Sequence, residues 1–313
     1  MELSIVIVNW NSRDLLLRCV ASIHTALGAA GHGVAGYEVI VVDNASFVGS
    51  VERAGLTSGE TVIRNCRNAG FAAACNQGAQ AASGEVLLML NPDCELRPGS
   101  AERCLRELRR TDMAVGICGV ALLDASGTVA KSCERFFNFA TLMGAATGLN
   151  ALLPTRMGAR MREWDHTEDR TVDHVIGAFY MVRADTWRAL GGFDERFHVY
   201  YEDMDLSKRV HHSGLCTRFL AQPASFHLGG GVSSQIKDVR LFYSWRSRVL
   251  YAFKHLPRWQ AWTHLAATLA VEPISRTLYA ALQRSPAALV QTWRGYTMLV
   301  RDLPAILQRA RLG

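Results

Sequence analysis

The chain has 313 residues, of which 49% are apolar and 20% are charged, and its formal net charge is +6. This composition excludes a largely disordered chain, because there is ample apolar surface to offset the entropy of ordering. No run reaches the roughly 18 apolar residues of a membrane-spanning helix, and we expect no secretory signal. The eight cysteines, none of them two or three residues apart, indicate buried, reduced thiols of a cytosolic protein rather than a zinc site.

The first hundred residues alternate between strand and helix patterns. Short apolar runs predict four strands, at residues 3–8, 38–42, 61–64 and 85–90. Helical spacing predicts helices at 12–27, with Ser12 as the N-cap, and at 71–82. Apolar strands separated by helices are typical of an α/β fold with a mostly parallel central sheet flanked by helices, a Rossmann-like arrangement.

The rest of the chain is less regular. Further strands are predicted at 114–123, 175–182 and 216–220, and helices at 185–190 and 202–212. Residues 136–172 are expected to be loop and short helix. From residue 237 onward the pattern is helical, and we expect prolines to divide it, at positions 257, 273, 286 and 304. The sequence therefore predicts a catalytic domain over 1–236, with halves of about 1–123 and 124–236, and a helical extension over 237–313.

The net charge is concentrated in the predicted extension. Residues 1–236 hold 22 basic and 25 acidic residues, whereas residues 237–313 hold 12 basic and three acidic ones, for a net charge of +9. The extension is also rich in tryptophan. Such a composition suits an amphipathic helix at an anionic lipid surface or contact with nucleic acid, and packing or dimerisation through the helices is the alternative.

Polar residues follow three of the predicted strands where each strand ends. They are Asn9, Asn11, Asp43, Asn44 and Asp93. Carboxyl ends of parallel strands share one edge, where α/β proteins bind ligands, so we expect these residues to converge. Asp93 follows a proline and could bind a divalent cation that also holds phosphate oxygens. The alternative for Asp93 is a residue that stabilises a turn through its own side chain.

Three further features could carry chemistry. Glu202, Asp203 and Asp205 open a helix, where they either complement the helix dipole or supply a general base. His227 precedes three glycines and is either structural or a metal or phosphate ligand. Asn68 and Gly70 precede a helix whose N-terminus would favour an anion. Neither a dinucleotide-binding nor a P-loop motif is present, which argues against an oxidoreductase or a P-loop NTPase.

These features occur together in a known order. The segments are 5–11 (IVIVNWN), 41–46 (VVDNAS), 68–71 (NAGF) with 76–78 (NQG), 90–93 (LNPD), 191–194 (GGFD), 201–206 (YEDMDL), and His227 with 229–233 (GGGVS). In this order the chain resembles glycosyltransferase family 2, most of all its rhamnosyltransferase-like branch. The resemblance covers about residues 3–250 and implies the GT-A fold, which binds nucleotide-sugars.

The resemblance implies a role for each matching residue. Asp43 corresponds to the residue that recognises the base or ribose of the nucleotide, in a pocket shared with Asn9 and Asn11. The remaining nucleotide-sugar candidates are Asn68, Gly70, Asn76, Asn91 and Asp93. Asp93 also corresponds to the last acidic residue of the D-x-D metal motif, whose first position is Asn91 here. His227 corresponds to a metal-binding histidine.

The implied reaction is a single displacement that needs one base. Asp203 corresponds to that base and Glu202 supports it; a raised pKa of Asp203 would favour proton acceptance at neutral pH. The implied function is inverting, metal-dependent transfer, with Mg²⁺ or Mn²⁺, of L-rhamnose from dTDP-rhamnose to a glycan or lipid-linked acceptor in cell-surface polysaccharide synthesis. Alternatives are UDP-galactofuranose, UDP-glucose or another UDP-hexose as donor, or a non-catalytic nucleotide-sugar-binding scaffold; a nucleic-acid-binding protein is not expected.

The basic, aromatic stretch after the catalytic half has two interpretations. Trp245, Arg246 and Arg248 either contact acceptor or donor phosphate, or belong to a helix with Trp245 packed inward. Since family members extend glycans on polyprenyl-diphosphate lipids, we expect the +9 segment to dock on anionic lipid. This places the protein at the periphery of the cytoplasmic membrane, on its inner face, with a homo-oligomer through the C-terminal helices as the alternative.

Overall fold

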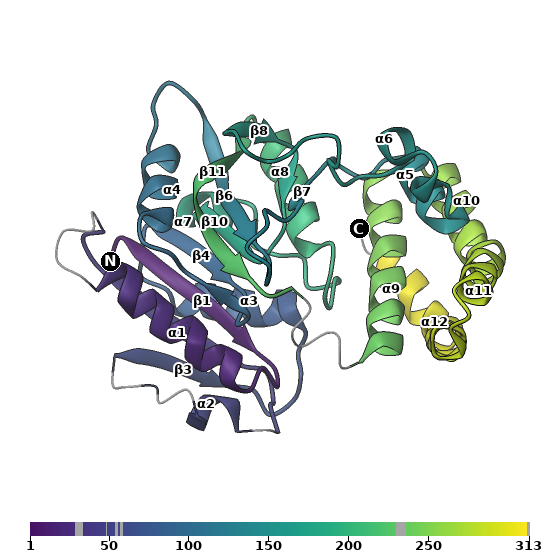
Figure 1. Ribbon diagram of the computed structural model, residues 1–313, viewed down its shortest axis with the longest axis horizontal. Helices are drawn as coiled ribbons and strands as arrows, with labels where there is room; N and C mark the ends of the chain where they lie inside the picture. Colours follow the sequence, from purple (N-terminus) through teal and green to yellow (C-terminus); the bar gives the residue numbers. More distant parts are fainter. Residues whose placement is uncertain (29–33, 48, 54–55, 57–58, 230–235, 312–313) are drawn as a thin grey trace. The chain divides into compact units, whose positions relative to one another are not determined.

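The computed structural model describes residues 1–28, 34–47, 49–53, 56, 59–229 and 236–311 (Figure 1). The chain forms two compact units. Unit 1 comprises Met1–Glu134, Trp164–Glu195 and Glu202–Val232, and unit 2 comprises Arg135–Glu163, Arg196–Tyr201 and Ser233–Gly313.

A nine-stranded sheet forms the centre of the described part of unit 1, in the order β3-β2-β1-β4-β10-β6-β11-β5, with β8 also paired to β11. Its strands are β1 (Leu3–Asn9), β2 (Tyr37–Asp43), β3 (Glu60–Arg64), β4 (Val86–Leu90), β5 (Cys94–Glu95), β6 (Val115–Leu123), β8 (Arg170–Val172), β10 (Phe179–Arg183) and β11 (Cys216–His227). Strands β5, β8 and β10 pair antiparallel with their neighbours, and the other pairs are parallel. A small second sheet joins β7 (Cys133–Glu134) and β9 (His174–Val175).

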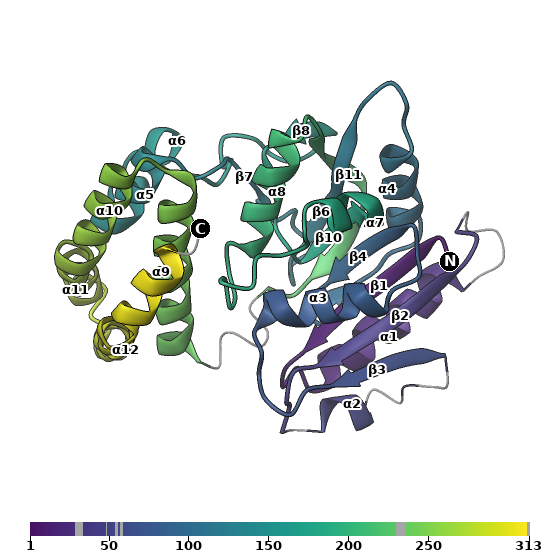
Figure 2. The same ribbon diagram turned by 180° about the vertical axis from the view of Figure 1, so that it is seen from behind.

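Helices cover both faces of this sheet (Figures 1 and 2). They are α1 (Asp14–Leu27), α2 (Ser50–Arg53), α3 (Phe71–Ala81), α4 (Ser100–Leu108), α7 (Ala184–Ala189) and α8 (Glu202–His212). Alternate residues of β1 divide between the faces: Leu3, Ile5 and Ile7 share a core with α1 and α4, whereas Val6 faces α3. At Gly78 of α3 a Cβ atom would lie 2.3 Å from Val6, so glycine permits the close approach of helix and sheet.

Strand register brings the chemically important residues to one edge of the sheet. Asn9, the last residue of β1, pairs with Asp43, the last residue of β2. Leu90 ends β4 opposite Phe179, the first residue of β10, and His227 ends β11 opposite Cys94. Because β10 runs antiparallel, its amino end joins the carboxyl ends of β1, β2, β4 and β11 at this edge.

Unit 2 is helical. Its elements are α5 (Phe139–Thr147), η1 (Leu149–Ala151), α6 (Pro154–Met157), α9 (Lys237–His255), α10 (Arg258–Ala270), α11 (Glu272–Leu282) and α12 (Pro286–Arg311). Leu142 of α5 packs with Ala252 and Ala261 in a buried cluster. Trp245 stacks on Tyr296 with ring centroids 4.1 Å apart, and Gly295 lets α12 approach this ring. Among the described residues, no helix is long and apolar enough to span a bilayer.

A buried carboxylate ties four side chains of unit 2 together. Glu272 is fully buried; it accepts a hydrogen bond from Nε1 of Trp245 at 2.8 Å and pairs with Arg248 and Arg276. Burial lowers the pKa of Arg248, but the charge of Glu272 outweighs burial and the net pKa is raised. This cluster fixes α9 against α11.

The predicted α/β fold with a mostly parallel sheet, of the GT-A kind and followed by C-terminal helices, is confirmed. Several details differ from the sequence predictions. Residues 135–163 and 196–201 belong to unit 2 together with the C-terminal helices. Residues 135–163 join it because α5 packs on α10 and α11. Pro304 does not divide the last helix, since Leu299 and Ile306 are buried on either side of it within α12.

Local predictions were wrong in four further places. Ser12 does not cap α1, because its hydroxyl donates to Oδ1 of Asn9. The strand expected at 175–182 is interrupted, with β9 ending at Val175 and β10 beginning at Phe179. Strand β11 continues to His227 through a register shift after Leu220. Cys66 is exposed and Cys216 is half-buried, whereas the other six cysteines are buried.

Candidate functional site

The ends of β1 and β2 form the part of the site expected to bind the nucleotide. Nδ2 of Asn9 donates to Oδ1 of Asp43 at 2.7 Å and to Oγ of Ser46 at 3.1 Å. The turn after β1 is fixed by Asn11, whose backbone N–H donates to Ser46 and whose Oδ1 accepts from the N–H of Phe47. Asn9, Asn11 and Asp43 are thus brought together, with Asp43 held in place by a fully buried amide.

Asn44, which was not among the nucleotide-binding candidates, organises the loop before α3. Its Nδ2 donates to Oδ1 of Asn68 at 2.8 Å and to the carbonyl of Gly70 at 3.2 Å, while its Oδ1 accepts from the N–H of Ala69. Gly70 has φ 93°, which favours glycine, and its N–H donates to Asn68. The loop is therefore linked to the end of β2. Only the position of Asn44 after Asp43 signals this role in the sequence.

Asn76 bonds to the turn that follows α7 rather than to the strand ends. Its Nδ2 donates to the carbonyl of Phe193 at 2.8 Å and to Glu195 at 2.9 Å, and its Oδ1 accepts from the N–H of Phe193. Gly192 has φ 67°, and a Cβ there would lie 2.5 Å from Oδ1 of Asn76. These bonds account for Asn76 structurally, and direct contact with a nucleotide-sugar stays a prediction.

Asp93 and His227 form the candidate metal centre. Oδ1 of Asp93 lies 3.3 Å from Nε2 of His227, and both side chains are largely buried. Two atoms at this separation can coordinate one cation at about 2.0–2.2 Å from each. The turn that carries Asp93 is fixed by Asn91, whose N–H donates to Ala178 and whose carbonyl accepts from Cys94. Asn91 thus shapes the candidate metal centre through its backbone.

Cys94 adds a third potential ligand that the sequence did not single out. Its Sγ lies within 4.8 Å of the ligand atoms of Asp93 and His227, and it donates to the carbonyl of Ala178 at 3.2 Å. Burial raises the pKa of the Cys94 thiol well above its usual range, and the charge of Asp93 adds to this effect. Asp93 and His227 offer one carboxylate oxygen and one imidazole nitrogen, which fits Mn²⁺ or Mg²⁺.

Asp203, at the start of α8, reaches the same edge of the sheet. Its Oδ2 accepts from the N–H of Gly177 at 2.7 Å, just before β10 begins. Burial raises the pKa of Asp203, but His174 and the backbone N–H groups of Gly177 and Met204 outweigh burial and lower the net pKa. The raised pKa expected for Asp203 is therefore wrong, and its surroundings favour the charged carboxylate.

The neighbouring Glu202, rather than Asp203, has a raised pKa. This side chain is buried, and burial together with the charge of Asp203 raises its pKa well above the usual range. Asp205 points elsewhere, to an ion pair with Arg209, which also bonds to the carbonyls of Leu190 and Gly192. Two adjacent carboxyl groups with pKa values moved apart can take different roles. Here the environment favours the charged form of Asp203 and the neutral form of Glu202.

His174 is a site residue that sequence reasoning missed. It is 2% exposed, and its Nε2 lies 3.5 Å from Oδ2 of Asp203. On its other side Nδ1 bonds to Oγ of Ser207 at 2.9 Å, and Ser207 bonds to the hydroxyl of Tyr180 at 3.1 Å. His174 is separated from Asp203 by 28 residues, and no motif spacing joins them. The fold alone reveals that a buried imidazole orients and stabilises the charged carboxylate.

We expect replacement of His174 by phenylalanine to move the acid limb of the pH–rate profile to higher pH. Without the imidazole, burial still raises the pKa of Asp203, and only the backbone N–H groups of Gly177 and Met204 lower it. Asp203 is therefore protonated at a higher pH, by about one unit or more. The profile of kcat/KM against pH measures this shift. Tyr180→Phe is the matched control, because it removes a hydroxyl beyond Ser207 and leaves His174; equal shifts in both variants would contradict the role of His174.

The predicted acceptor contacts lie in the interior of unit 2. Trp245 and Arg248 are buried against Glu272, and Arg246 is 5% exposed and pairs with Asp302 at 3.1 Å. Packing within unit 2 accounts for all three, and their contact with acceptor or phosphate stays a prediction. Of the glycine-rich segment 229–233, only Gly229 lies within the described residues.

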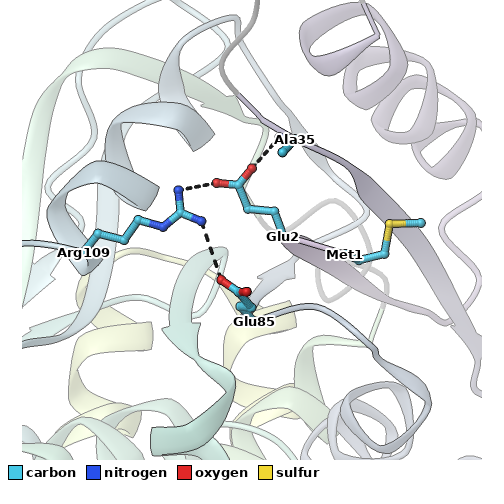
Figure 3. A pocket seen from close by; sticks show the side chains of 5 residues that line it. All are labelled: Met1, Glu2, Ala35, Glu85 and Arg109. Atoms are coloured by element: carbon cyan, nitrogen blue, oxygen red, sulfur yellow. Dashed lines mark hydrogen bonds and ion pairs between the residues drawn. The ribbon is translucent and has the colours of Figure 1, made fainter.

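A pocket of about 400 Å³ lies at the amino ends of the strands (Figure 3). It is lined by Met1, Glu2, Ala35, Glu85 and Arg109. Arg109 pairs with Glu2 at 2.5 Å and reaches Glu85 at 3.7 Å. Glu2 and Glu85 immediately precede β1 and β4, so this pocket is at the edge opposite Asn9 and Asp93 and has no part in the candidate site.

The chain is similar to known proteins in sequence and in fold. The family model described as Glycosyl transferase family 2 matches residues 4–185. O-antigen biosynthesis protein RfbC of Myxococcus xanthus is 32% identical over 161 residues, which are 49% of this chain and 12% of that protein. N-acetylglucosaminyl-diphospho-decaprenol L-rhamnosyltransferase of Mycobacterium tuberculosis is 28% identical over 148 residues, which are 45% of this chain and 46% of that protein. The matched regions therefore span less than half the length of these curated relatives.

Two solved structures have the same fold. Mannosyltransferase PcManGT from Pyrobaculum calidifontis, in complex with GDP-Man and Mn²⁺, superposes with a TM-score of 0.54 and 18% identity, covering 99% of this chain and 86% of that chain. S. aureus TarS 1-349 superposes with a TM-score of 0.50 and 11% identity, covering 97% and 92%. At these identities the likeness extends to the fold alone.

Proposed function

Because the chain belongs to glycosyltransferase family 2, we propose that it transfers a sugar from a nucleotide diphosphate donor to an acceptor hydroxyl, with inversion at the anomeric carbon. The observation that supports this proposal is that Asp203 and the Asp93–His227 pair lie at the same edge of the sheet. A preformed carboxylate base and a cation site are the two elements that such a displacement needs.

The donor is held by the strand ends. Asp43, fixed by Asn9, accepts hydrogen bonds from the base or ribose, and the first turn of α3, which begins after Gly70, contributes backbone N–H groups. Asp93 and His227 hold a divalent cation, Mn²⁺ or Mg²⁺, which when bound neutralises the diphosphate charge and assists its departure. Mn²⁺ bound with GDP-Man in PcManGT supports this choice.

The reaction is a single displacement. An oxygen of Asp203 takes the proton of the acceptor hydroxyl, the hydroxyl oxygen forms a bond to the anomeric carbon, and the bond between that carbon and the nucleotide diphosphate breaks. His174 keeps Asp203 charged and oriented. One carboxylate base suffices, in contrast to the carboxylate pair of a glycoside hydrolase.

For the donor we propose dTDP-L-rhamnose and for the acceptor a glycan on a polyprenyl-diphosphate lipid, in cell-surface polysaccharide synthesis. This choice is supported by the activities named for two relatives, L-rhamnose transfer for the Mycobacterium tuberculosis protein and O-antigen biosynthesis for RfbC. A lipid-linked acceptor would bring the enzyme to the inner face of the cytoplasmic membrane as a peripheral protein. UDP-galactofuranose and UDP-hexoses are the competing donors.

A panel of nucleotide-sugars tests the proposal. We expect dTDP-rhamnose with Mn²⁺ to raise the melting temperature most, because a ligand that binds only the folded state stabilises it. Transfer to a lipid-linked acceptor, followed by mass spectrometry, then identifies the product. A larger shift and product with a UDP-sugar would replace rhamnose, and binding without turnover of any donor would favour a non-catalytic scaffold.

Replacing Asp93 by asparagine is expected to weaken Mn²⁺ binding by about tenfold or more, since the only charged oxygen of the pair is lost. Calorimetric titration of Mn²⁺ in the presence of the nucleoside diphosphate measures this directly, without turnover. Asp185→Asn, on the exposed surface of α7, is the matched control. Unchanged Mn²⁺ affinity in Asp93→Asn would remove Asp93 from the metal centre.

A further inference from the structure

Helix α11 of unit 2 exposes large apolar side chains along one side. Ile274, Leu278 and Leu282 are 62%, 60% and 81% exposed and follow one another at four-residue spacing. Residues four apart lie on one side of an α-helix. The buried residues Glu272 and Ala280 lie on the opposite side, which packs into the unit. The stripe is thus an outward face rather than a gap in the packing.

The helices on either side of α11 add exposed tryptophans. Helices α10 and α12 both pack against α11 (Figures 1 and 2). Trp259 and Trp262 of α10 and Trp293 of α12 are each about half or more exposed. We call the α11 stripe the outer apolar surface; the three tryptophans are exposed on the two helices that pack against it. Monomeric proteins rarely leave so much large apolar side chain in water without a partner.

The charge of unit 2 indicates what that partner is. The unit contains 17 Lys and Arg residues against four Asp and Glu residues. Three of the four acidic residues are in ion pairs within the unit, formed by Glu163, Glu272 and Asp302. Arg258 of α10 and Arg294 of α12 are exposed, as is Arg284 in the turn between α11 and α12. Tryptophan and aliphatic side chains bordered by arginine match an anionic lipid headgroup region.

We propose that the outer apolar surface docks unit 2 on a bilayer containing anionic phospholipid, with α11 lying in the headgroup region. This inference rests on the proposed use of a membrane-linked acceptor and names the residues that meet the membrane. The net positive charge of unit 2 does not bind the membrane by itself, because Arg246, Arg248 and Arg276 form ion pairs within the unit. Apolar insertion holds the protein on the bilayer, and the exposed arginines select anionic lipid.

Cosedimentation with vesicles separates insertion from charge attraction. The full chain is mixed with vesicles of phosphatidylcholine containing about 30% phosphatidylglycerol, and with pure phosphatidylcholine vesicles. The triple variant Ile274→Lys, Leu278→Lys, Leu282→Lys removes the stripe while adding positive charge. We expect its partition onto the anionic vesicles to fall at least tenfold, although charge attraction alone would strengthen it. Leu17→Lys, at an exposed apolar position of α1, is the matched control and should bind like the wild type.

Two further measurements keep the result interpretable. The thermal shift with the nucleotide-sugar, unchanged in the triple variant, shows that the fold and donor site remain intact, and a failure of transfer with normal vesicle binding would count against the proposed reaction alone. Equal vesicle binding by the triple variant and the wild type, or no binding by the wild type, would overturn the docking surface. A wild-type dimer that the triple variant loses, with vesicle binding unchanged, would assign the surface to a second copy of the chain.

Discussion

Asp203→Asn is expected to lower kcat by about 10²–10⁴-fold while donor binding stays within about twofold of the wild type. The amide has nearly the same shape and still offers an oxygen to the N–H of Gly177, but it cannot take a proton from the acceptor. Initial rates with saturating donor measure the loss, and calorimetry measures donor affinity.

Two controls show whether a loss of kcat in Asp203→Asn comes from the missing base. Asp185→Asn changes an exposed carboxylate of the same unit that pairs with Arg183, and its turnover should equal that of the wild type. The melting temperature of Asp203→Asn should show that the protein is folded. Turnover within about threefold of the wild type would mean that another group is the base.

Glu272→Gln is expected to cost about 3–5 kcal/mol in the free energy of unfolding of unit 2. The amide can still accept from Trp245, but it leaves the buried guanidinium of Arg248 without a countercharge. Urea denaturation followed by tryptophan fluorescence measures the loss, because Trp245 lies beside the changed group.

The exposed pair of unit 2 provides the control for this prediction. Glu163 pairs with Arg135, and both side chains are more than a third exposed, so Glu163→Gln should cost no more than about 1 kcal/mol. A cost for Glu272→Gln as small as that for Glu163→Gln would show that Arg248 finds another partner or reaches water.

Much of the sheet could be predicted from the sequence because its strands are short, continuous apolar runs. The run before Asn9 and the run before Asp43 need burial on both faces, and parallel topology then places the residues that follow them at one edge. Asn9, Asp43 and Asp93 were found by this reasoning. The same reasoning placed Asn44 at this edge but could not assign its role, because that role depends on a loop that begins some 20 residues later.

The electrostatic state of the base could not be read from the sequence either. It depends on His174, which enters through β9, and on the N–H of Gly177, where the strand is interrupted. Apolar residues on both sides of Gly177 predict one continuous strand, so the hydrophobic pattern of the sequence does not reveal the interruption between β9 and β10. In unit 2, sequence pattern recognises that Arg248 lies in a helix but cannot show that a carboxylate 24 residues later neutralises it.

The repeated crossing of the chain between its two units has a consequence for synthesis on the ribosome. Residues 135–163 leave the ribosome before their packing partners, because α5 packs against α9, α10 and α11. Nearly a hundred more residues must be synthesised before α5 can be buried. The sheet is complete once β11 has been made, whereas the helical unit must form last, around a segment laid down in advance. Neither unit is one continuous segment of the chain. A gene fusion that carries only the C-terminal helices would therefore lack the earlier segments of unit 2.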